Sequence, residues 1–292
     1  MSGEIEIETG LTGYLDKDAA VVETSRKEWE PEYNALSRLI DIFRRMSQLV
    51  IVKEESLSLP SQLFLVVLNQ SYGVTSELLR RRTTDAQGLM RRAVEAAGVA
   101  HRLWRHPELT QVFNEAYPDI NDDNHPKQFR PSNKYRQEFS SSQMFSGNSS
   151  ALQTLGSFYE LFSVGASHAG LGALAGQRWK DSVLALSARE TNRVEIGRAW
   201  HSVITAYWEI LRVFFAVLKS AIPDGMTAAV EADMKLWFED YKKTLKDRTP
   251  WIPDIHKINL KSIDSGYPNA FDLEQISGQE RQKRNIPSFP LS

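Results

Sequence analysis

The segment over residues 195–220 constrains the fold most, because it is apolar around almost the whole circumference of a helix. Its most apolar part runs over residues 203–218 and still includes Glu209 and Arg212. A membrane-spanning helix needs about 20 mostly apolar residues, which this run does not reach. We therefore expect a helix that is buried by other helices, and no membrane contact.

Other segments supply the neighbours that such a helix needs. Apolar residues recur at spacings of three and four, which is typical of amphipathic helices. This spacing predicts helices over 31–53, 58–82, 84–105 and from 152 to about 165. It also predicts a short helix that follows His106-Pro107 and ends at about 116, and a helix that follows Pro223-Asp224-Gly225 and ends at about 246. Ser58 is expected to cap the second of these helices, and Thr84 with Gln87 has the spacing of a capping box. We expect an all-α protein, a helical bundle of six or seven helices.

The remaining segments predict the domain organisation. Residues 1–22 are polar without a period, so we expect a flexible N-terminal arm. Residues 117–150 are predicted to form a long lid-like loop. Residues 248–292 carry repeated prolines and are expected to form an extended or disordered C-terminal tail. One helical domain over 23–247 remains, with an ambiguous stretch at 177–193 that includes a possible short strand at 183–186.

Composition and motifs exclude several kinds of chemistry. The 292 residues include no cysteine, which rules out disulfides, thiolate nucleophiles and cysteine-ligated zinc. Lysine and arginine number 35 against 37 acidic residues, so no overall positive field would gather nucleic acid. No P-loop, dinucleotide-binding fingerprint, zinc-protease helix or nucleophile elbow occurs. We expect no metal and no cofactor. The N-terminus lacks a secretory signal, which favours a cytoplasmic location.

An arginine cluster on the helix over 84–105 is the first candidate site. A planar guanidinium can donate two hydrogen bonds to a phosphate, which suits an anion site or a local contact with nucleic acid. The candidate anion-binding residues are Arg91, Arg92, Arg102 and Arg105. The alternative is a solvated helix face on which Arg91 and Glu95 form an i,i+4 ion pair.

His168 is the candidate catalytic residue. If the preceding helix continues, His168 shares a face with Leu161 and Val164 and points inward. A buried histidine can act as a general acid or base. The alternative is a core histidine that is satisfied by a hydrogen bond at a close helix crossing.

A narrow polar stripe on the helix over 195–220 is the third candidate. It comprises Arg198, His201, Glu209 and Arg212, with Ser202 and Thr205 between them. Such a mixed-charge stripe could line a cleft. The alternative is a solvent-facing seam on an otherwise buried helix.

The acidic run Asp119–His125 does not predict a calcium site. An EF-hand loop needs glycine at its sixth position and glutamate at its twelfth. This sequence has Asn124 and Arg130 there.

Two segments resemble a bacterial all-helical family of unknown function that is distantly HEPN-like. They are Arg91-Arg92-Ala93-Val94-Glu95-Ala96, and Phe158-Tyr159-Glu160-Leu161-Phe162-Ser163 leading to Ser167-His168. The resemblance covers about a third of the chain and implies a helical bundle of a kind that binds or cuts RNA. It also implies that Arg92, Glu95, Tyr159 and His168 lie near one another. The HEPN ribonuclease signature is an arginine, four to six intervening residues and then a histidine. It occurs at none of the six histidines, and Arg102 and His106 have only three residues between them.

Two functions are therefore expected. The first is a non-catalytic helical protein, placed in a bacterial defence or toxin–antitoxin type system, that binds a protein partner or its own copy through helix faces. Aromatic residues and arginines, both abundant here, are enriched at interface anchors. The alternative is a metal-independent HEPN-like ribonuclease or phosphate-handling enzyme that uses His168.

Overall fold

The computed structural model describes residues 10–116, 131–166, 179–180, 183–184, 190 and 192–248. Its long helices are α1 (Gly10–Glu28), α2 (Glu30–Leu49), α3 (Ser58–Leu79), α4 (Thr83–Arg105), α8 (Ser150–Ala166), α10 (Arg193–Leu218) and α11 (Asp224–Arg248). Short helices are α5 (Thr110–Asn114), α6 (Asn133–Glu138) and α7 (Ser141–Met144). Two-residue strands β1 (Trp179–Lys180) and β2 (Val183–Leu184) pair antiparallel. The predicted all-α helical bundle is confirmed.

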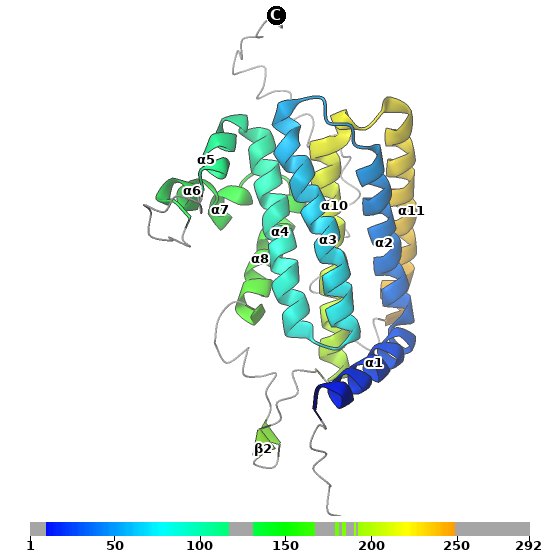
Figure 1. Cartoon of the computed structure of the whole chain (residues 1–292). Helices are drawn as coiled ribbons and strands as arrows, with labels where there is room; N and C mark the ends of the chain where they lie inside the picture. Colours follow the sequence, from blue (N-terminus) through cyan, green and yellow to red (C-terminus); the bar gives the residue numbers. More distant parts are fainter. Residues whose placement is uncertain are drawn as a thin grey trace, which may run out of the picture.

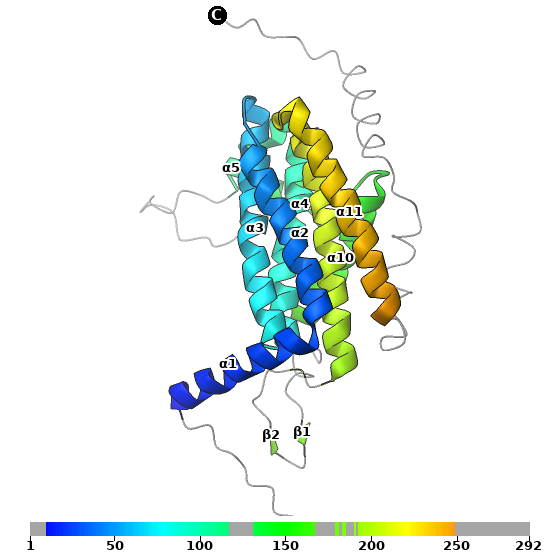
Figure 2. The ribbon, with the colours of Figure 1, turned by 90° about the vertical axis from the view of Figure 1, so that its right-hand side faces the viewer.

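Helix α10 lies at the centre of the bundle and contacts α2, α3, α4 and α8 (Figures 1 and 2). Among the described residues, the segment Arg193–Ala221 is the one that is long and apolar enough to cross a membrane, by length and composition. Its most apolar window is 94% buried within the bundle, so its apolar surface is already covered by protein. The prediction of a buried central helix is confirmed.

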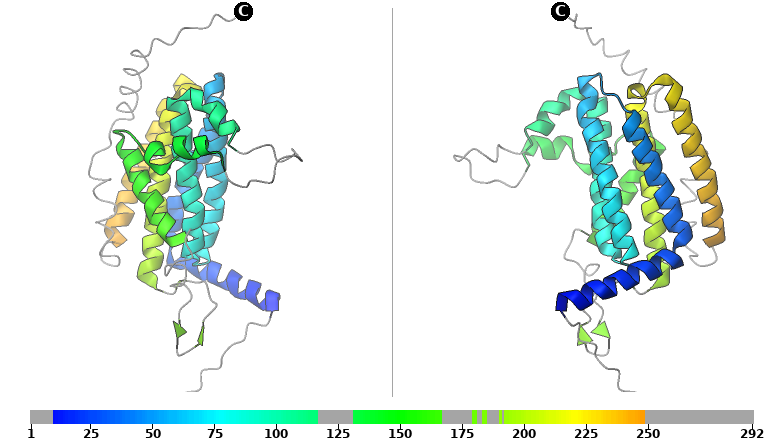
Figure 3. Two further views of the ribbon diagram at one scale, coloured as in Figure 1. Left: turned by 90° about the vertical axis from the view of Figure 1, so that its left-hand side faces the viewer. Right: turned by 45° about the vertical axis from the view of Figure 1, so that its right-hand side comes forward.

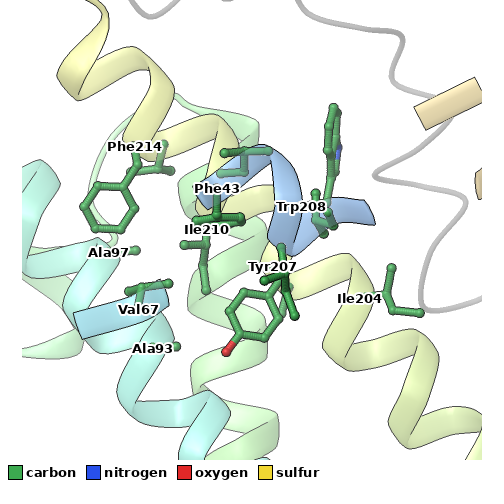
Figure 4. Close-up of a cluster of buried hydrophobic side chains, with 14 of the residues drawn as sticks. Phe43, Val67, Ala93, Ala97, Ile204, Tyr207, Trp208, Ile210 and Phe214 are labelled. Atoms are coloured by element: carbon green, nitrogen blue, oxygen red, sulfur yellow. The ribbon is translucent and has the colours of Figure 1, made fainter. Parts of the chain in front are cut away.

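The core consists of side chains from α10 and from the helices around it, α2, α3, α4, α8 and α11, and Figure 4 shows part of it. Phe43 of α2 stacks on Phe64 of α3 with 5.5 Å between ring centroids, and Phe64 lies 5.1 Å from Phe214 of α10. Helix α4 presents small residues to this cluster, including the fully buried Ala93 and Ala97. Small side chains let two backbones approach closely, which allows α4 to contact α3, α8 and α10 together.

Part of the segment predicted as a long loop is helical. Helices α6 and α7 cover the C-terminal half of α4, and Phe139 and Met144 join its residues in a second apolar cluster. The prediction of a loop over 117–150 is therefore wrong for α6 and α7, and residues 117–130 lie outside the described part of the chain. Two anchoring residues in so short a stretch are too few to produce a visible period.

Helix α1 occupies most of the segment predicted as a flexible arm. It starts at Gly10 and crosses the lower end of the bundle (Figure 2). Arg80 Nε lies 2.6 Å from Asp18 Oδ2, Arg82 Nη2 lies 3.1 Å from Asp18 Oδ1, and Arg81 Nη2 lies 2.8 Å from Glu28 Oε2. The spacing of apolar residues did not predict this helix, because the contacts that hold it include ion pairs with arginines far away in the sequence. Residues 1–9 lie outside the described part of the chain.

That turn, between α3 and α4, closes as a Schellman motif. The Arg82 amide donates to Glu77 O and the Arg81 amide to Leu78 O, both at 2.9 Å. Arg81 has φ 59°, a left-handed conformation usually occupied by glycine. Neither predicted cap forms, because α3 starts at Ser58 itself and α4 starts at Thr83, without a side-chain cap on either helix.

The end of the chain and the segment 177–193 are described only in part. Helix α11 extends to Arg248, the first residue of the tail predicted over 248–292, and residues 249–292 lie outside the described residues. The strand expected at 183–186 corresponds to β2 over Val183–Leu184.

Candidate functional site

The four arginines of the candidate anion site do not form one site. Arg91 and Arg92 line an open pocket near the start of α4. Arg102 is 9% exposed and donates to Glu138 Oε2 of α6 at 2.7 Å. Arg105 lies beside His101, whose pKa is lowered to about 3 by burial and, after it, by the charge of Arg105. About three helical turns separate the first two arginines from the last two.

The pocket has a volume of about 560 Å³, within the usual range of roughly 300–1,000 Å³ for small-molecule sites. Its charged lining consists of three arginines and three carboxylates. They are Arg82, Arg91, Arg92, Glu77, Asp85 and Glu95. A pocket with balanced charge of this kind is not a simple anion site, because any bound anion also meets the carboxylates.

Arg91 is fixed by α8 and not by its neighbour on α4. Its Nη2 donates to Tyr159 Oη at 3.0 Å, and its guanidinium carbon lies 5.0 Å from the centroid of the same ring. Within the described residues the expected ion pair between Arg91 and Glu95 does not form, and Arg91 Nε is buried without a hydrogen-bond partner. The interpretation as a paired, solvated face is wrong at this position because Tyr159 takes the guanidinium.

Arg92 and Glu95 are two polar groups of the pocket that the described part of the chain leaves open. Arg92 is exposed, and neither residue makes a hydrogen bond or ion pair with a described residue. Arg92 precedes Glu95 by three positions, and a basic residue N-terminal to an acidic one is the weaker order for a helical ion pair. Both side chains are therefore available to a ligand.

The opposite wall of the pocket is already paired. Arg82 contacts Asp18 at 3.1 Å and Glu77 at 3.5 Å. Burial raises the pKa of the Glu77 carboxyl above its usual value, with Arg80 lowering it and Asp85 and Asp18 raising it. Arg82 therefore contributes little net positive charge to the pocket.

His168 lies outside the described residues, so its predicted inward position is not described. The last described residue of α8 is Ala166. Helix α8 runs antiparallel to α4, because Tyr159 contacts Arg91 while Gly156 and Gly98 both face Phe145 (Figure 3). The end of α8 therefore points toward the end of α4 that carries the pocket.

The polar stripe of α10 faces inward. His201 and Glu209 are 1% and 2% exposed. His201 Nδ1 lies 2.9 Å from Tyr241 Oη of α11, and His201 Nε2 lies 3.4 Å from Glu32 Oε1 of α2. The interpretation as a solvent-facing seam is wrong for this part of the stripe, because α2 and α11 supply polar partners that a local period cannot reveal.

The ends of the stripe are paired within α10. Arg198 contacts Glu195 at 2.6 Å, and Arg212 contacts Glu209 at 2.7 Å. Burial raises the pKa of Glu209, and the charge and hydrogen bond of Arg212 lower it. The stripe therefore joins helices and lines neither of the two described pockets.

The sequence interpretation missed the outer face of α3. Its exposed residues are all uncharged, and three of them are large and apolar. They are Gln62, Leu65, Val66, Asn69 and Tyr72. Leu65, Val66 and Tyr72 are 49%, 44% and 52% exposed. A signal was present, because no charged residue occurs from Ser58 to Ser76.

The outer faces of neighbouring helices differ from that of α3. The exposed residues of α2 include Arg38, Asp41 and Arg44, and those of α11 include Lys235 and Glu239. Helix α3 lies at the surface of the bundle between α2 and α4 (Figure 1). We call its five exposed residues the α3 face.

Among the described residues, no group of three or more histidine, aspartate or glutamate side chains is placed to hold a metal ion. No protein-family model, curated protein or solved structure matches the chain.

Proposed function

We propose that this protein is a non-catalytic helical assembly protein whose copies associate through the α3 face. The observation that carries the proposal is the exposure of Leu65, Val66 and Tyr72 on one helix that has no charge from Ser58 to Ser76. Contiguous exposed apolar surface rimmed by polar groups marks interaction sites. Each Å² of apolar surface removed from water stabilises the assembly by about 25 cal/mol.

The α3 face can pair with the same face of a second copy, because it carries no charge that would be repelled there. Two copies related by a two-fold axis bring the same face of each copy together, so a residue on the axis meets its own counterpart and a charge there would oppose a like charge. The α3 face has none. In an antiparallel pair of helices centred on Asn69, Leu65 and Val66 of each copy lie opposite Tyr72 of the other. The two Asn69 amides then meet, and each offers both a donor and an acceptor.

Light scattering over a dilution series tests the proposal. The expected mass at high concentration approaches twice that of the 33.2 kDa chain and falls on dilution. Leu65→Glu places two like charges in the paired face and is expected to give a monomer at every concentration. Leu236→Glu is the matched control, since Leu236 is 59% exposed but lies on α11.

Two results would overturn the proposal. One is a wild-type protein that stays monomeric over the whole series. The other is a Leu65→Glu protein, folded by circular dichroism, whose mass equals that of the wild type and of Leu236→Glu at each concentration.

A further inference from the structure

We infer that the pocket at the start of α4 binds a small zwitterionic ligand of the amino-acid class, through Arg91 and Arg92 on one side and Glu95 and Asp85 on the other. The pocket is separate from the α3 face. The inference therefore stands or falls independently of self-association.

The pocket offers positive charge to a ligand through two of its three arginines. Arg82 is neutralised by Asp18 and Glu77. Arg91 is held by the neutral hydroxyl and ring of Tyr159, which leaves its positive charge uncompensated. Arg92 makes no ion pair with any described residue. Two guanidinium charges are thus directed to the pocket from one turn of α4.

The same lining also carries negative charge. Glu95 makes no ion pair within the described part of the chain, and Asp85 lies on the preceding turns of α4. Asp85 is also close enough to Glu77 to raise the pKa of that carboxyl. Two carboxylates therefore lie on the same lining as the two arginines, which favours a cationic group on the ligand there.

These charges exclude the simplest ligands. A phosphate or other pure anion would satisfy the arginines but would face the carboxylates at close range. A pure cation such as a polyamine would face the two arginines. A ligand with one charge of each sign satisfies both sets, since charge-assisted hydrogen bonds to each are stronger than neutral ones.

The spacing of the groups fits a compact zwitterion. Residues three apart on a helix have Cβ atoms about 5–6 Å apart, which places Arg92 and Glu95 on either side of a ligand whose charges are a few bonds apart. The carboxylate of an amino acid accepts from Arg92, and Arg91 belongs to the same lining. The ammonium donates to Glu95. The volume of about 560 Å³ leaves room for a side chain.

Isothermal titration calorimetry of the full chain tests this inference. The probes are the standard L-amino acids one at a time, inorganic phosphate alone and putrescine alone. At least one amino acid is expected to bind more tightly than phosphate or putrescine. Arg92→Gln and Glu95→Gln are each expected to weaken that binding by roughly tenfold or more, as the loss of a charged hydrogen bond implies.

Arg38→Gln is the matched control, because Arg38 lies in the second pocket between α2 and α11 and pairs with Asp240. Its affinity for the amino acid is expected to equal that of the wild type. Three results would overturn the inference: no amino acid binds, phosphate or putrescine binds as tightly as any amino acid, or the folded Arg92→Gln and Glu95→Gln proteins bind as the wild type does.

Discussion

His201 Nδ1 lies 2.9 Å from Tyr241 Oη, so a hydrogen bond joins α10 to α11 in the interior of the bundle. Glu32 of α2 lies 3.4 Å from the other ring nitrogen. Three helices thus meet at polar groups that are 3% exposed or less. Buried polar groups that have partners favour one arrangement of the helices, because any shift leaves a group unsatisfied.

Tyr241→Phe is expected to lower the free energy of unfolding by about 1–3 kcal/mol, since it removes one partner of a buried histidine and keeps the ring. Urea unfolding followed by circular dichroism measures the change. Lys243→Ala is the control on the same helix, because its side chain is 77% exposed, and its effect is expected within about 0.5 kcal/mol. Equal stability of Tyr241→Phe and the wild type would show that the hydrogen bond contributes nothing.

Gly98→Ala is expected to destabilise the protein by about 1–3 kcal/mol through overpacking. A Cβ at this position would lie 2.8 Å from Phe145 Cε1 and 3.1 Å from Met144 Cβ, so α7 must move away from α4. Gly225→Ala in α11 meets nothing within 4 Å and serves as the control. Thermal unfolding compares the two, and a Gly98→Ala protein as stable as Gly225→Ala contradicts the close contact.

Acid is expected to destabilise the protein through His101. Burial, followed by the charges of Arg105 and His106, lowers the pKa of His101 to about 3, against 6.5 for an ordinary histidine. Between these two values the unfolded chain binds the proton and the folded chain does not. The stability that His101 contributes is therefore complete above pH 6.5 and is lost as the pH falls toward 3, by up to about 1.4 kcal/mol per pH unit.

His101→Phe isolates this effect, since phenylalanine keeps a ring beside Trp104 and does not titrate. Urea unfolding at pH 7, 5.5 and 4 is expected to show a smaller loss for His101→Phe than for the wild type. Parallel losses in the two proteins would mean that other groups cause the acid sensitivity.

Incubation of the purified protein with pooled RNA is expected to give no cleavage. The sequence has no histidine at the HEPN distance from an arginine, and the described pocket balances its arginines with carboxylates. His168→Ala is the comparison. Cleavage by the wild type that is lost in His168→Ala would favour the alternative, a metal-independent ribonuclease.

The sequence could predict the long helices other than α1, and which of them lies at the centre. Apolar residues from Trp200 to Phe215 cover the circumference of α10 except for one narrow polar stripe, and the burial of most of the helix follows from that. The spacing of apolar residues shows which side of one helix is apolar, but not which other helix packs against it. The partners of His201 come from α2 and α11, far away in the chain, so the orientation of its stripe was beyond a local pattern.

The candidate site was predicted only in part for the same reason. Arg91 and Arg92 do line a pocket, but Tyr159 decides what Arg91 pairs with, and Tyr159 belongs to another helix. The α3 face was within reach of the sequence, because a helix without charge over residues 58–76 is unusual for a surface. A search for amphipathic helices looks for apolar residues on the buried side of a helix. It does not register that the exposed side of α3 lacks charged residues.

Helix α1 and the helical bundle respond to different properties of the solution. The ion pairs of Arg80, Arg81 and Arg82 with Asp18 and Glu28 weaken as salt screens their charges. The aromatic core around α10 does not weaken in this way, because removal of apolar surface from water depends little on ionic strength. A concentrated salt solution is therefore expected to weaken the attachment of α1 while the rest of the bundle stays folded.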